Sequence, residues 1–392
     1  MNPMKLSVSK MAPRFWLGCF LFLCVGSAYI PESAHGVEPL LDIGVFKLSR
    51  LEAFNLARDG KFPEAVQAEE RALRIAEAQF GPLHPSLVPI YSDLGTLHRS
   101  MAEYQKSEQD YKWGLALLEK NMGLDHPSVA EFLDRLASLN ADLGRNDEAE
   151  LLEKRALSIR KSNPSSDPKV LAQTLGLLGQ IETNLKNYSQ AQNCFQEALE
   201  TQEKSPKPDY NLPIHLLTAQ ARVFQLEKNF AKAQSCLEIA LDMAQKHFQA
   251  VSVEVANGME NLADLFQVQN QVDKAHPLYE SALQIDQRYV GKVFSFSALP
   301  YLKRLAKVEW SAGDAKASED LWKKSLQIEK EAFGPRHTLI ALDLLHLAEA
   351  EISLKEKNKA QENLKESINI LKNYFPNDYP LVVLAREQLK VR

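Results

Sequence analysis

The sequence has few cysteines, no excess of basic residues and no apolar run of membrane-spanning length. Only four of its 392 residues are cysteine, which excludes a disulfide-stabilised fold. Lysine and arginine number 46 against 51 aspartates and glutamates, so the formal charge of -5 gives no indication of nucleic-acid binding. The most apolar run, Phe15 to Val25, is eleven residues long, whereas a spanning helix needs about 20.

Motifs that carry catalysis are also missing. The chain has no phosphate-binding Gly-x-x-x-x-Gly-Lys-Ser/Thr loop, no Gly-x-Gly-x-x-Gly turn, no His-Glu-x-x-His helix and no Gly-x-Ser-x-Gly elbow. Its nine histidines are scattered and show no metal-ligand spacing. We therefore predict a protein that is not an enzyme and that has no cofactor and no metal site.

The first 36 residues have the layout of a secretory signal peptide. Three bases, Lys5, Lys10 and Arg14, precede the apolar run, and small residues follow it at 26–28. We predict that residues 1–36 are a signal peptide and short linker, and that the mature protein is exported, to a periplasm or by secretion. The alternative is that this segment is not cleaved and anchors the protein to a membrane, which would be its only membrane contact.

One small residue recurs along the chain with a nearly constant spacing of 42 residues. Two further series of small residues follow it at distances of 12 and 19, beginning at Ala65 and Ala72. Antiparallel helices approach closely only where the facing side chains are small, so the pattern predicts eight tandem helix pairs. The recurring residue, called the reference residue below, is Ala53, Gly95, Ala137, Gly179, Ala221, Ala263, Ala306 and Ala348.

The period divides residues 37–392 into eight units and a C-terminal cap. Short breakers such as Asp59-Gly60 separate the two helices of a unit, since glycine ends helices readily. Cys194 and Cys236 occupy equivalent places in neighbouring units, about 8–10 Å apart or more, so we predict that both are free thiols. The units are about 46–87, 88–129, 130–171, 172–213, 214–255, 256–298, 299–340 and 341–382, with the cap at 383–392.

Small residues at the eighth, twentieth and twenty-seventh places of a helix pair resemble the tetratricopeptide repeat. The 42-residue unit and its Gly-x-x-His-Pro linker, at Gly81 to Pro85 and Gly123 to Pro127, are similar to the kinesin-light-chain type. The resemblance covers about residues 40–388 and implies an all-α tetratricopeptide (TPR) solenoid, a right-handed superhelix of about eight repeats. The coiled coil that precedes the repeats in kinesin light chains is missing, which disfavours a motor-adaptor role.

The linker residues favour a structural role. Proline sets the direction of the chain as it enters the next helix. We expect the histidine to bond carbonyl groups at the end of the preceding helix.

In such a solenoid the first helix of each pair lines the concave face. We expect groove-facing residues six and three places before the reference residue, and one, four and five places after it. Arginine can hold a carboxylate through two bonds, and asparagine can both donate to and accept from a peptide backbone. Trp310 either anchors a partner or packs under the neighbouring repeat. The predicted partner-binding residues are Arg50, Arg58, Arg99, Arg222, Asn257, Asn261, Asp264, Lys303, Lys307 and Trp310.

These residues predict an exported scaffold that binds a protein or peptide segment in its groove, and not a nucleic acid. The alternative is a membrane-anchored architectural subunit of an envelope or secretory assembly, acting through its convex face or its ends.

Overall fold

The computed structural model describes residues 40–163, 166–206, 209–290, 296–374, 377 and 379–390. The predicted signal peptide and linker lie outside these residues. Within them the chain forms seventeen α-helices, two short 3-10 segments and no strand, which confirms the all-α prediction. No helix in the described part has the length and apolar character needed to cross a membrane.

Sixteen of the described helices form eight antiparallel pairs, and α17 (Pro380–Lys390) follows them. The first helices are α1 (Leu40–Arg58), α3 (Val88–Ser100), α5 (Pro127–Asp142), α7 (Pro168–Asn184), α9 (Asn211–Leu226), α11 (Val253–Val268), α13 (Leu299–Ala312) and α15 (Thr338–Ser353). The second helices are α2 (Phe62–Phe80), α4 (Tyr104–Met122), α6 (Asn146–Ser162), α8 (Tyr188–Gln202), α10 (Phe230–His247), α12 (Val272–Val290), α14 (Ala315–Phe333) and α16 (Lys357–Lys372). The 3-10 segments η2 (Pro85–Leu87) and η3 (Phe296–Ala298) precede α3 and α13.

Several first helices begin before the unit boundaries drawn from the period; α9, for example, begins at Asn211 rather than at 214. Likewise α17 begins at Pro380, ahead of the cap predicted at 383. Its buried residues Val382 and Ala385 stand 42 places after Ile340 and Asp343 of α15, which are also buried. Helix α17 therefore occupies the place of the first helix of a ninth unit.

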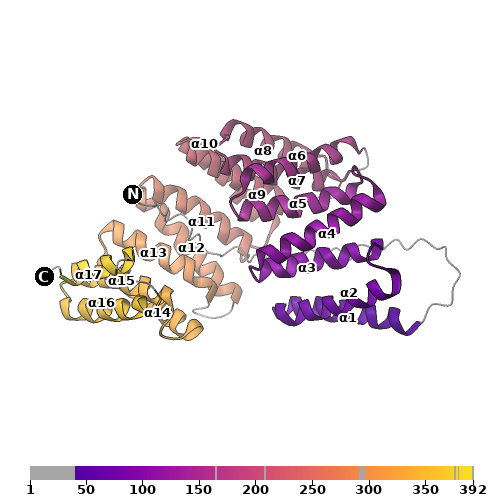
Figure 1. The fold of residues 1–392 in the computed structure, drawn as a ribbon. Helices are drawn as coiled ribbons and strands as arrows, with labels where there is room; N and C mark the ends of the chain where they lie inside the picture. Colours follow the sequence, from indigo (N-terminus) through magenta and orange to yellow (C-terminus); the bar gives the residue numbers. More distant parts are fainter. Residues whose placement is uncertain are drawn as a thin grey trace, which may run out of the picture.

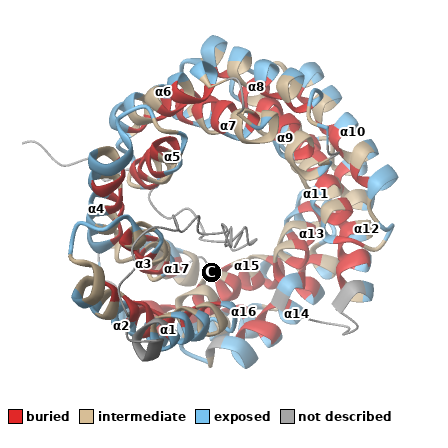
Figure 2. Ribbon diagram, turned by 90° about the vertical axis from the view of Figure 1, so that its right-hand side faces the viewer, coloured by how far each residue is buried: buried red, intermediate tan, exposed pale blue. Residues whose placement is uncertain are grey.

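The pairs wind into a right-handed superhelix. Seen from the end that carries α1, the first helices line the inside of a ring and the second helices form its outside (Figure 2). The pairs follow one another clockwise as they recede from the viewer, which defines the hand. Figure 1 places α1 and α16 at opposite ends of the molecule, although they overlap in the axial view.

Close helix approach explains why small residues recur. A Cβ atom built on Gly95 would lie 2.4 Å from the ring of Tyr111, and one on Gly179 would lie 2.8 Å from that of Phe195. Both rings project from the second helix of the same pair and are almost completely buried. Ser107, twelve residues after Gly95, donates a hydrogen bond of 2.7 Å from its Oγ to the carbonyl of Gly95. The small residues thus allow aromatic rings of the second helix to pack directly against the backbone of the first helix.

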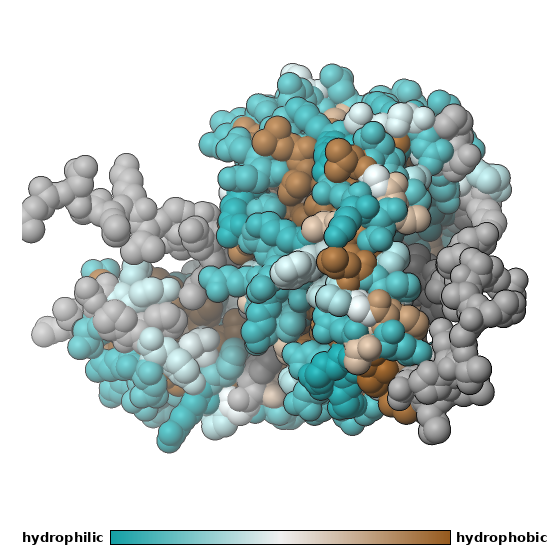
Figure 3. Space-filling model, turned by 45° about the vertical axis from the view of Figure 1, so that its right-hand side comes forward, coloured by the Kyte–Doolittle hydropathy of each residue, from teal (hydrophilic) through white to brown (hydrophobic). Residues whose placement is uncertain are grey.

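Outside this core the surface is largely polar. On the face drawn in Figure 3, hydrophilic side chains prevail and hydrophobic patches are small and separate. Cys194 and Cys236 are half-buried free thiols, as predicted. Burial raises the pKa of the Cys194 thiol to about 11, so it is protonated near neutral pH.

The linker histidines cap the helix that follows them, and the prediction that they bond the preceding helix was wrong. The Nδ1 atoms of His84, His126 and His337 accept backbone N–H groups of Ser86, Ser128 and Leu339. Each ring thereby satisfies a backbone donor at the start of the following helix, which has no partner within that helix. The linker before α7 uses Asp167 in the same way, since its carboxylate accepts the N–H of Lys169 at 2.9 Å.

A histidine cap of this kind should contribute measurably to the free energy of unfolding of the protein. Replacing His126 with alanine is expected to lower the free energy of unfolding by about 1 kcal/mol, because a backbone N–H at the start of α5 loses its acceptor. His126→Asn supplies another acceptor of similar reach and should retain most of the stability. Urea unfolding followed by circular dichroism measures both variants. Equal stability of the wild type and His126→Ala would show that the cap contributes nothing.

Candidate protein-binding groove

Four positions on each first helix face the interior of the superhelix. They lie six and two residues before the reference residue, and one and five after it; on α9 they are His215, Ala219, Arg222 and Leu226. With 3.6 residues per turn, these positions fall within about 60° of one another on the helix. The positions three before and four after lie roughly 70–90° to one side of the middle of this face, toward the next repeat. Several predicted residues occupy these two sideways positions.

At the N-terminal end, the predicted groove arginines join consecutive repeats. The guanidinium of Arg50 binds Glu69 at 3.2 Å and Asp93 at 2.5 Å. The guanidinium of Arg99 binds Asp142 at 2.5 Å and also donates to Ser138. Both are thus already engaged within the chain.

Arg58 differs from these two arginines. It is exposed, and its only ion pair among the described residues is a distant one with Asp59, at 3.7 Å.

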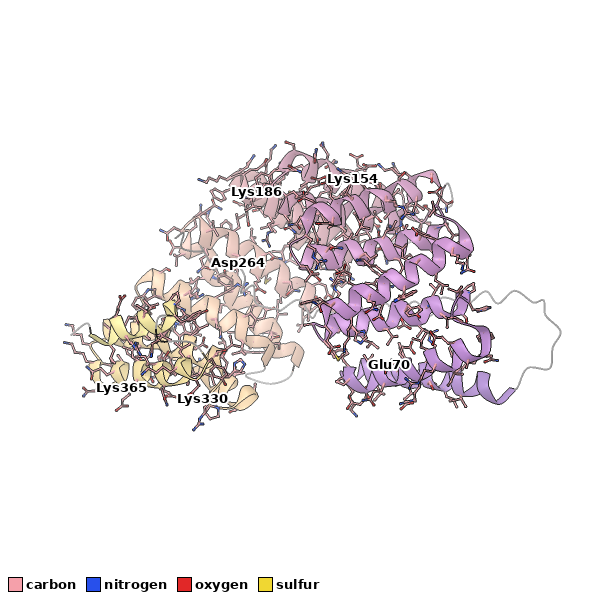
Figure 4. All side chains as sticks on the ribbon, viewed as in Figure 1. Glu70, Lys154, Lys186, Asp264, Lys330 and Lys365 are labelled. Atoms are coloured by element: carbon pink, nitrogen blue, oxygen red, sulfur yellow. The ribbon has the colours of Figure 1, made fainter. Side chains whose placement is uncertain are left out.

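A similar arrangement holds α13 between α11 and α15. Lys303 Nζ lies 2.6 Å from Glu329 and 2.8 Å from Asp343, both of which are buried. Arg304, which the sequence analysis did not single out, binds Glu260 at 2.5 Å and Asp264 at 2.8 Å. Asp264 lies midway along the superhelix (Figure 4). Its carboxylate also accepts a hydrogen bond from the hydroxyl of Tyr279. Lys303 and Asp264 therefore tie the solenoid together.

A third junction lies between α5, α6 and α7. Arg160 of α6 makes two bonds to the carboxylate of Asp134, of 2.5 and 2.7 Å, and also donates to Thr174. Glu153 is fully buried beside this pair, and neither of its carboxylate oxygens has a hydrogen-bond partner. Burial, and then the nearby Asp134, raise the pKa of Glu153 to about 9, against the opposing effect of Arg160. Its second-helix position, beyond the groove, explains why sequence reasoning missed it.

These junctions share an excess of acid over base. Except at Arg99, each cation has two carboxyl groups around it, so one acid is incompletely compensated. Burial raises the pKa of Glu69 to about 8, partly opposed by Arg50, and that of Glu329 to about 7, partly opposed by Lys303. Glu69, Glu153 and Glu329 therefore bind protons near neutral pH, and the junctions provide internal structure.

Three other carboxylates, Glu319, Glu351 and Glu356, lie close together at the C-terminal end. Glu319 accepts from Lys316 at 2.7 Å and from Lys323, while Glu351 accepts from Asn363 at 2.8 Å. Lysine and amide donors thus already satisfy this cluster, and we assign no metal to it.

The middle of the groove is different, because five of its polar side chains have no partner in the described part of the chain. These five residues, called the central floor, come from the three adjacent helices α7, α9 and α11. All are exposed except Asn261, which is half-buried, and they are Gln173, Gln180, Arg222, Asn257 and Asn261. Leu177 and Ala219 lie between them and provide a short apolar strip. The central floor thus combines unused donors, unused acceptors and one unpaired guanidinium.

Two predicted residues on α13 are also free. Lys307 is exposed and has no ion pair among the described residues. The Trp310 side chain is 40% exposed in the last turn of the helix, so part of its indole ring is open to a partner. Of the ten predicted residues, the structure leaves Arg222, Asn257, Asn261, Lys307 and Trp310 available to a partner.

Comparison with known proteins agrees with this architecture. The tetratricopeptide repeat family matches residues 47–120, 170–246 and 297–373, and a second tetratricopeptide repeat profile matches 129–162. These matches cover more than half of the chain, which therefore belongs to the tetratricopeptide repeat family. A search of curated proteins finds no match.

Solved structures include relatives of the kinesin-light-chain type, as the linkers predicted. BtubC (BKLC) from P. vanneervenii is similar with 19% identity and a TM-score of 0.50, over 64% of this chain and 95% of that one. A Podosopora anserina protein described as a kinesin light chain has 19% identity and a TM-score of 0.47, over 53% of this chain and 99% of that one. The quorum sensor NprR from B. thuringiensis has 11% identity and a TM-score of 0.59, over 86% and 89% of the two chains. At these identities the similarity establishes the fold alone.

Proposed function

We propose that this chain is a protein-binding scaffold whose central floor holds a segment of a partner protein. The observation that carries the proposal is the contrast within one groove. On either side of the floor, Arg50, Arg99, Lys303 and Arg304 are used by the fold itself. The floor keeps its amides and Arg222 free, so a partner can bind there without breaking an existing ion pair.

The amides suit a protein partner in particular. An asparagine side chain donates and accepts at once, so Asn257 and Asn261 can bond both the N–H and the C=O groups of an incoming segment. The free guanidinium of Arg222 can hold a carboxylate through two parallel bonds. No arrangement of nucleophile and base accompanies them on the floor, which supports binding rather than catalysis.

Substitutions on the floor test this function. Partners are first captured from the compartment where the protein resides, and their affinities are then measured by titration calorimetry. Asn257→Ala combined with Asn261→Ala should weaken binding at least about tenfold, or roughly 1.4 kcal/mol. Arg222→Glu should have a similar or larger effect.

The matched controls lie on the outer face, where Asn193 and Lys365 are exposed and have no partner among the described residues. Asn193→Ala and Lys365→Glu should bind as the wild type does; Lys365 is marked in Figure 4. If the floor variants bind as tightly as these controls, the groove is not the binding site.

The location of the protein is part of the proposal. The basic start, apolar run and small residues of the first 36 positions support export with cleavage. N-terminal sequencing of the mature protein should find a start near residue 29 or 37. A mature chain that begins at Met1 would instead favour the membrane-anchored alternative.

A further inference from the structure

Adjacent helix pairs of the superhelix are joined by polar contacts as well as by apolar packing. We call a hydrogen bond or ion pair between side chains of adjacent pairs a polar tie. Among the described residues, seven of the eight junctions, counting the one before α17, have a polar tie of 2.8 Å or shorter. In chain order, one tie from each of these junctions is Arg50 with Asp93, Arg99 with Asp142, Lys161 with Glu197, Gln192 with Glu227, Arg304 with Glu260, Lys303 with Asp343, and Gln388 with Glu349.

The remaining junction, between the pair α9–α10 and the pair α11–α12, is different. Among the described residues of these four helices, no hydrogen bond or ion pair joins a side chain of one pair to a side chain of the other. His215 of α9 and Glu254 of α11 interact electrostatically, but partial burial lowers the pKa of His215, so its ring carries little charge near neutral pH. The groove residues beside this junction, Arg222, Asn257 and Asn261, belong to the central floor and are unpaired in the described chain.

Apolar packing alone therefore holds this junction, which we call the α10–α11 junction. One apolar core continues across it and includes Leu237 and Ala240 of α10 and Val255 of α11. The two helices also approach closely, because a Cβ atom built on Gly258 would lie 3.5 Å from the Cβ of Leu241. Apolar contact has no preferred direction, whereas a hydrogen bond weakens as its angle changes. Helices joined by apolar contact can thus slide past one another without breaking a bond.

The place of this junction in the groove gives such sliding a consequence. Arg222 lies on one side of the junction, and Asn257 and Asn261 lie on the other. A rotation between α10 and α11 therefore changes the distance between the free guanidinium and the free amides. At the next two junctions the groove residues Arg304 and Lys303 form polar ties, which fix the corresponding distances.

We propose that the superhelix bends at the α10–α11 junction and that this motion opens and narrows the central floor. Helices α1–α10 and α11–α17 are then two arms, each held internally by its polar ties. A partner segment that contacts both Arg222 and the amides of α11 takes the place of the missing tie and favours one angle between the arms. This effect of a partner rests on the proposed function, whereas the bending itself does not.

Distances between spin labels test the bending in the isolated mature protein. The labels are attached to an azide-bearing amino acid introduced at exposed positions of second helices, each 21 places after a reference residue. The pair at Glu200 and Gln327 spans three junctions that include α10–α11, and the control pair at Arg74 and Glu200 spans three junctions with polar ties. Double electron–electron resonance should give a distance distribution at least about twice as wide for the first pair as for the control.

A disulfide across the junction tests where the motion occurs. The separation of 3.5 Å between the Cβ positions of Gly258 and Leu241 suits a disulfide, for which about 3.5–4.5 Å is usual. Leu241→Cys combined with Gly258→Cys should therefore link α10 to α11, in a background in which Cys194 and Cys236 are replaced by alanine. The oxidised variant should show the first label pair as narrow as the control, and reduction of the same sample should restore the wide distribution. Circular dichroism and intact mass establish the fold and the cross-link.

Further label pairs locate the motion even if the cross-link does not form. The pair at Ala116 and Asp242 ends at α10, and the pair at Gln284 and Asn369 begins at α12, so neither spans the α10–α11 junction. Both should give distributions no wider than the control. Equal widths for the first pair and the control would overturn the bending. A wide distribution for either further pair, or a cross-link that leaves the first pair wide, would overturn its assignment to α10–α11.

The bending and the proposed function fail separately. If the arms are rigid while Asn257→Ala combined with Asn261→Ala loses captured partners, the groove binds as a fixed shape and the proposed function stands. If the arms bend while that double variant binds its partners normally, the hinge stands and the central floor is not the binding site.

Discussion

Glu153→Leu is expected to raise the free energy of unfolding at pH 7 by about 3 kcal/mol. The wild-type carboxyl is completely buried without a hydrogen-bond partner, and burial raises its pKa from the ordinary 4.5 to about 9. At pH 7, about 2.5 pH units above the ordinary pKa of glutamate, ionisation of this carboxyl stabilises the unfolded state. The stabilisation is about 1.36 kcal/mol for each pH unit. Leucine removes this penalty and fits the site, because Leu237 and Leu364 fill the equivalent positions of other repeats.

The sign of the pH dependence follows from the same shift. Below pH 4.5, an acid whose pKa is raised by folding is protonated in both the folded and the unfolded state and does not lower the free energy of unfolding. The free energy of unfolding then declines as the pH rises toward 9. Glu69 and Glu329, raised to about 8 and 7, act in the same direction. Urea unfolding at pH 5, 7 and 9 should show the wild type losing stability, and Glu153→Leu losing less.

Glu148 provides the control for this experiment. It lies on the same helix, is exposed and has no partner in the described chain, so Glu148→Leu should change stability by no more than about 0.5 kcal/mol. A Glu153→Leu variant that is less stable than the wild type at pH 7 would mean that the carboxylate is favourably solvated or paired.

Lys303→Met is expected to lower the free energy of unfolding at pH 7 by about 3 kcal/mol. The ammonium group is the cation shared by Glu329 and Asp343, whose side chains are 0% and 3% exposed. Removing one partner of a buried ion pair strands the other charge in a poorly solvated place. The loss should shrink at pH 5, because Glu329, whose pKa is raised to about 7, is then protonated and no longer leaves a stranded charge.

Lys307 is the matched control, four residues along the same helix. It is exposed and unpaired among the described residues, so Lys307→Met should alter stability by less than about 0.5 kcal/mol. Thermal unfolding of the two variants separates the roles, with Lys303 structural and Lys307 available to a partner. Equal stability of both variants would contradict the shared-cation junction.

Much of the architecture follows from the order of residues alone. The reference residues from Ala53 to Ala348 predicted the helix pairs, because a small side chain is required wherever two helices nearly touch. The same period placed Cys194 and Cys236 too far apart to bridge, and the resemblance to the tetratricopeptide repeat placed the first helices on the inside of the superhelix. These features repeat in every unit, so one-dimensional spacing is sufficient to predict them.

Only the tertiary structure decided which groove side chains remain free. Arg50 and Arg222 both lie near a reference residue, but one faces the next repeat and meets Asp93, 43 positions away, while the other faces open solvent. A shift of a few residues turns a side chain by 60° or more around its helix, and its partner then depends on the neighbouring unit. The direction of the His126 cap likewise became known only from the structure, in which its Nδ1 accepts the N–H of Ser128 at the start of α5. Repetition specifies where helices pack, whereas pairing between unlike residues of adjacent units depends on their positions in three dimensions.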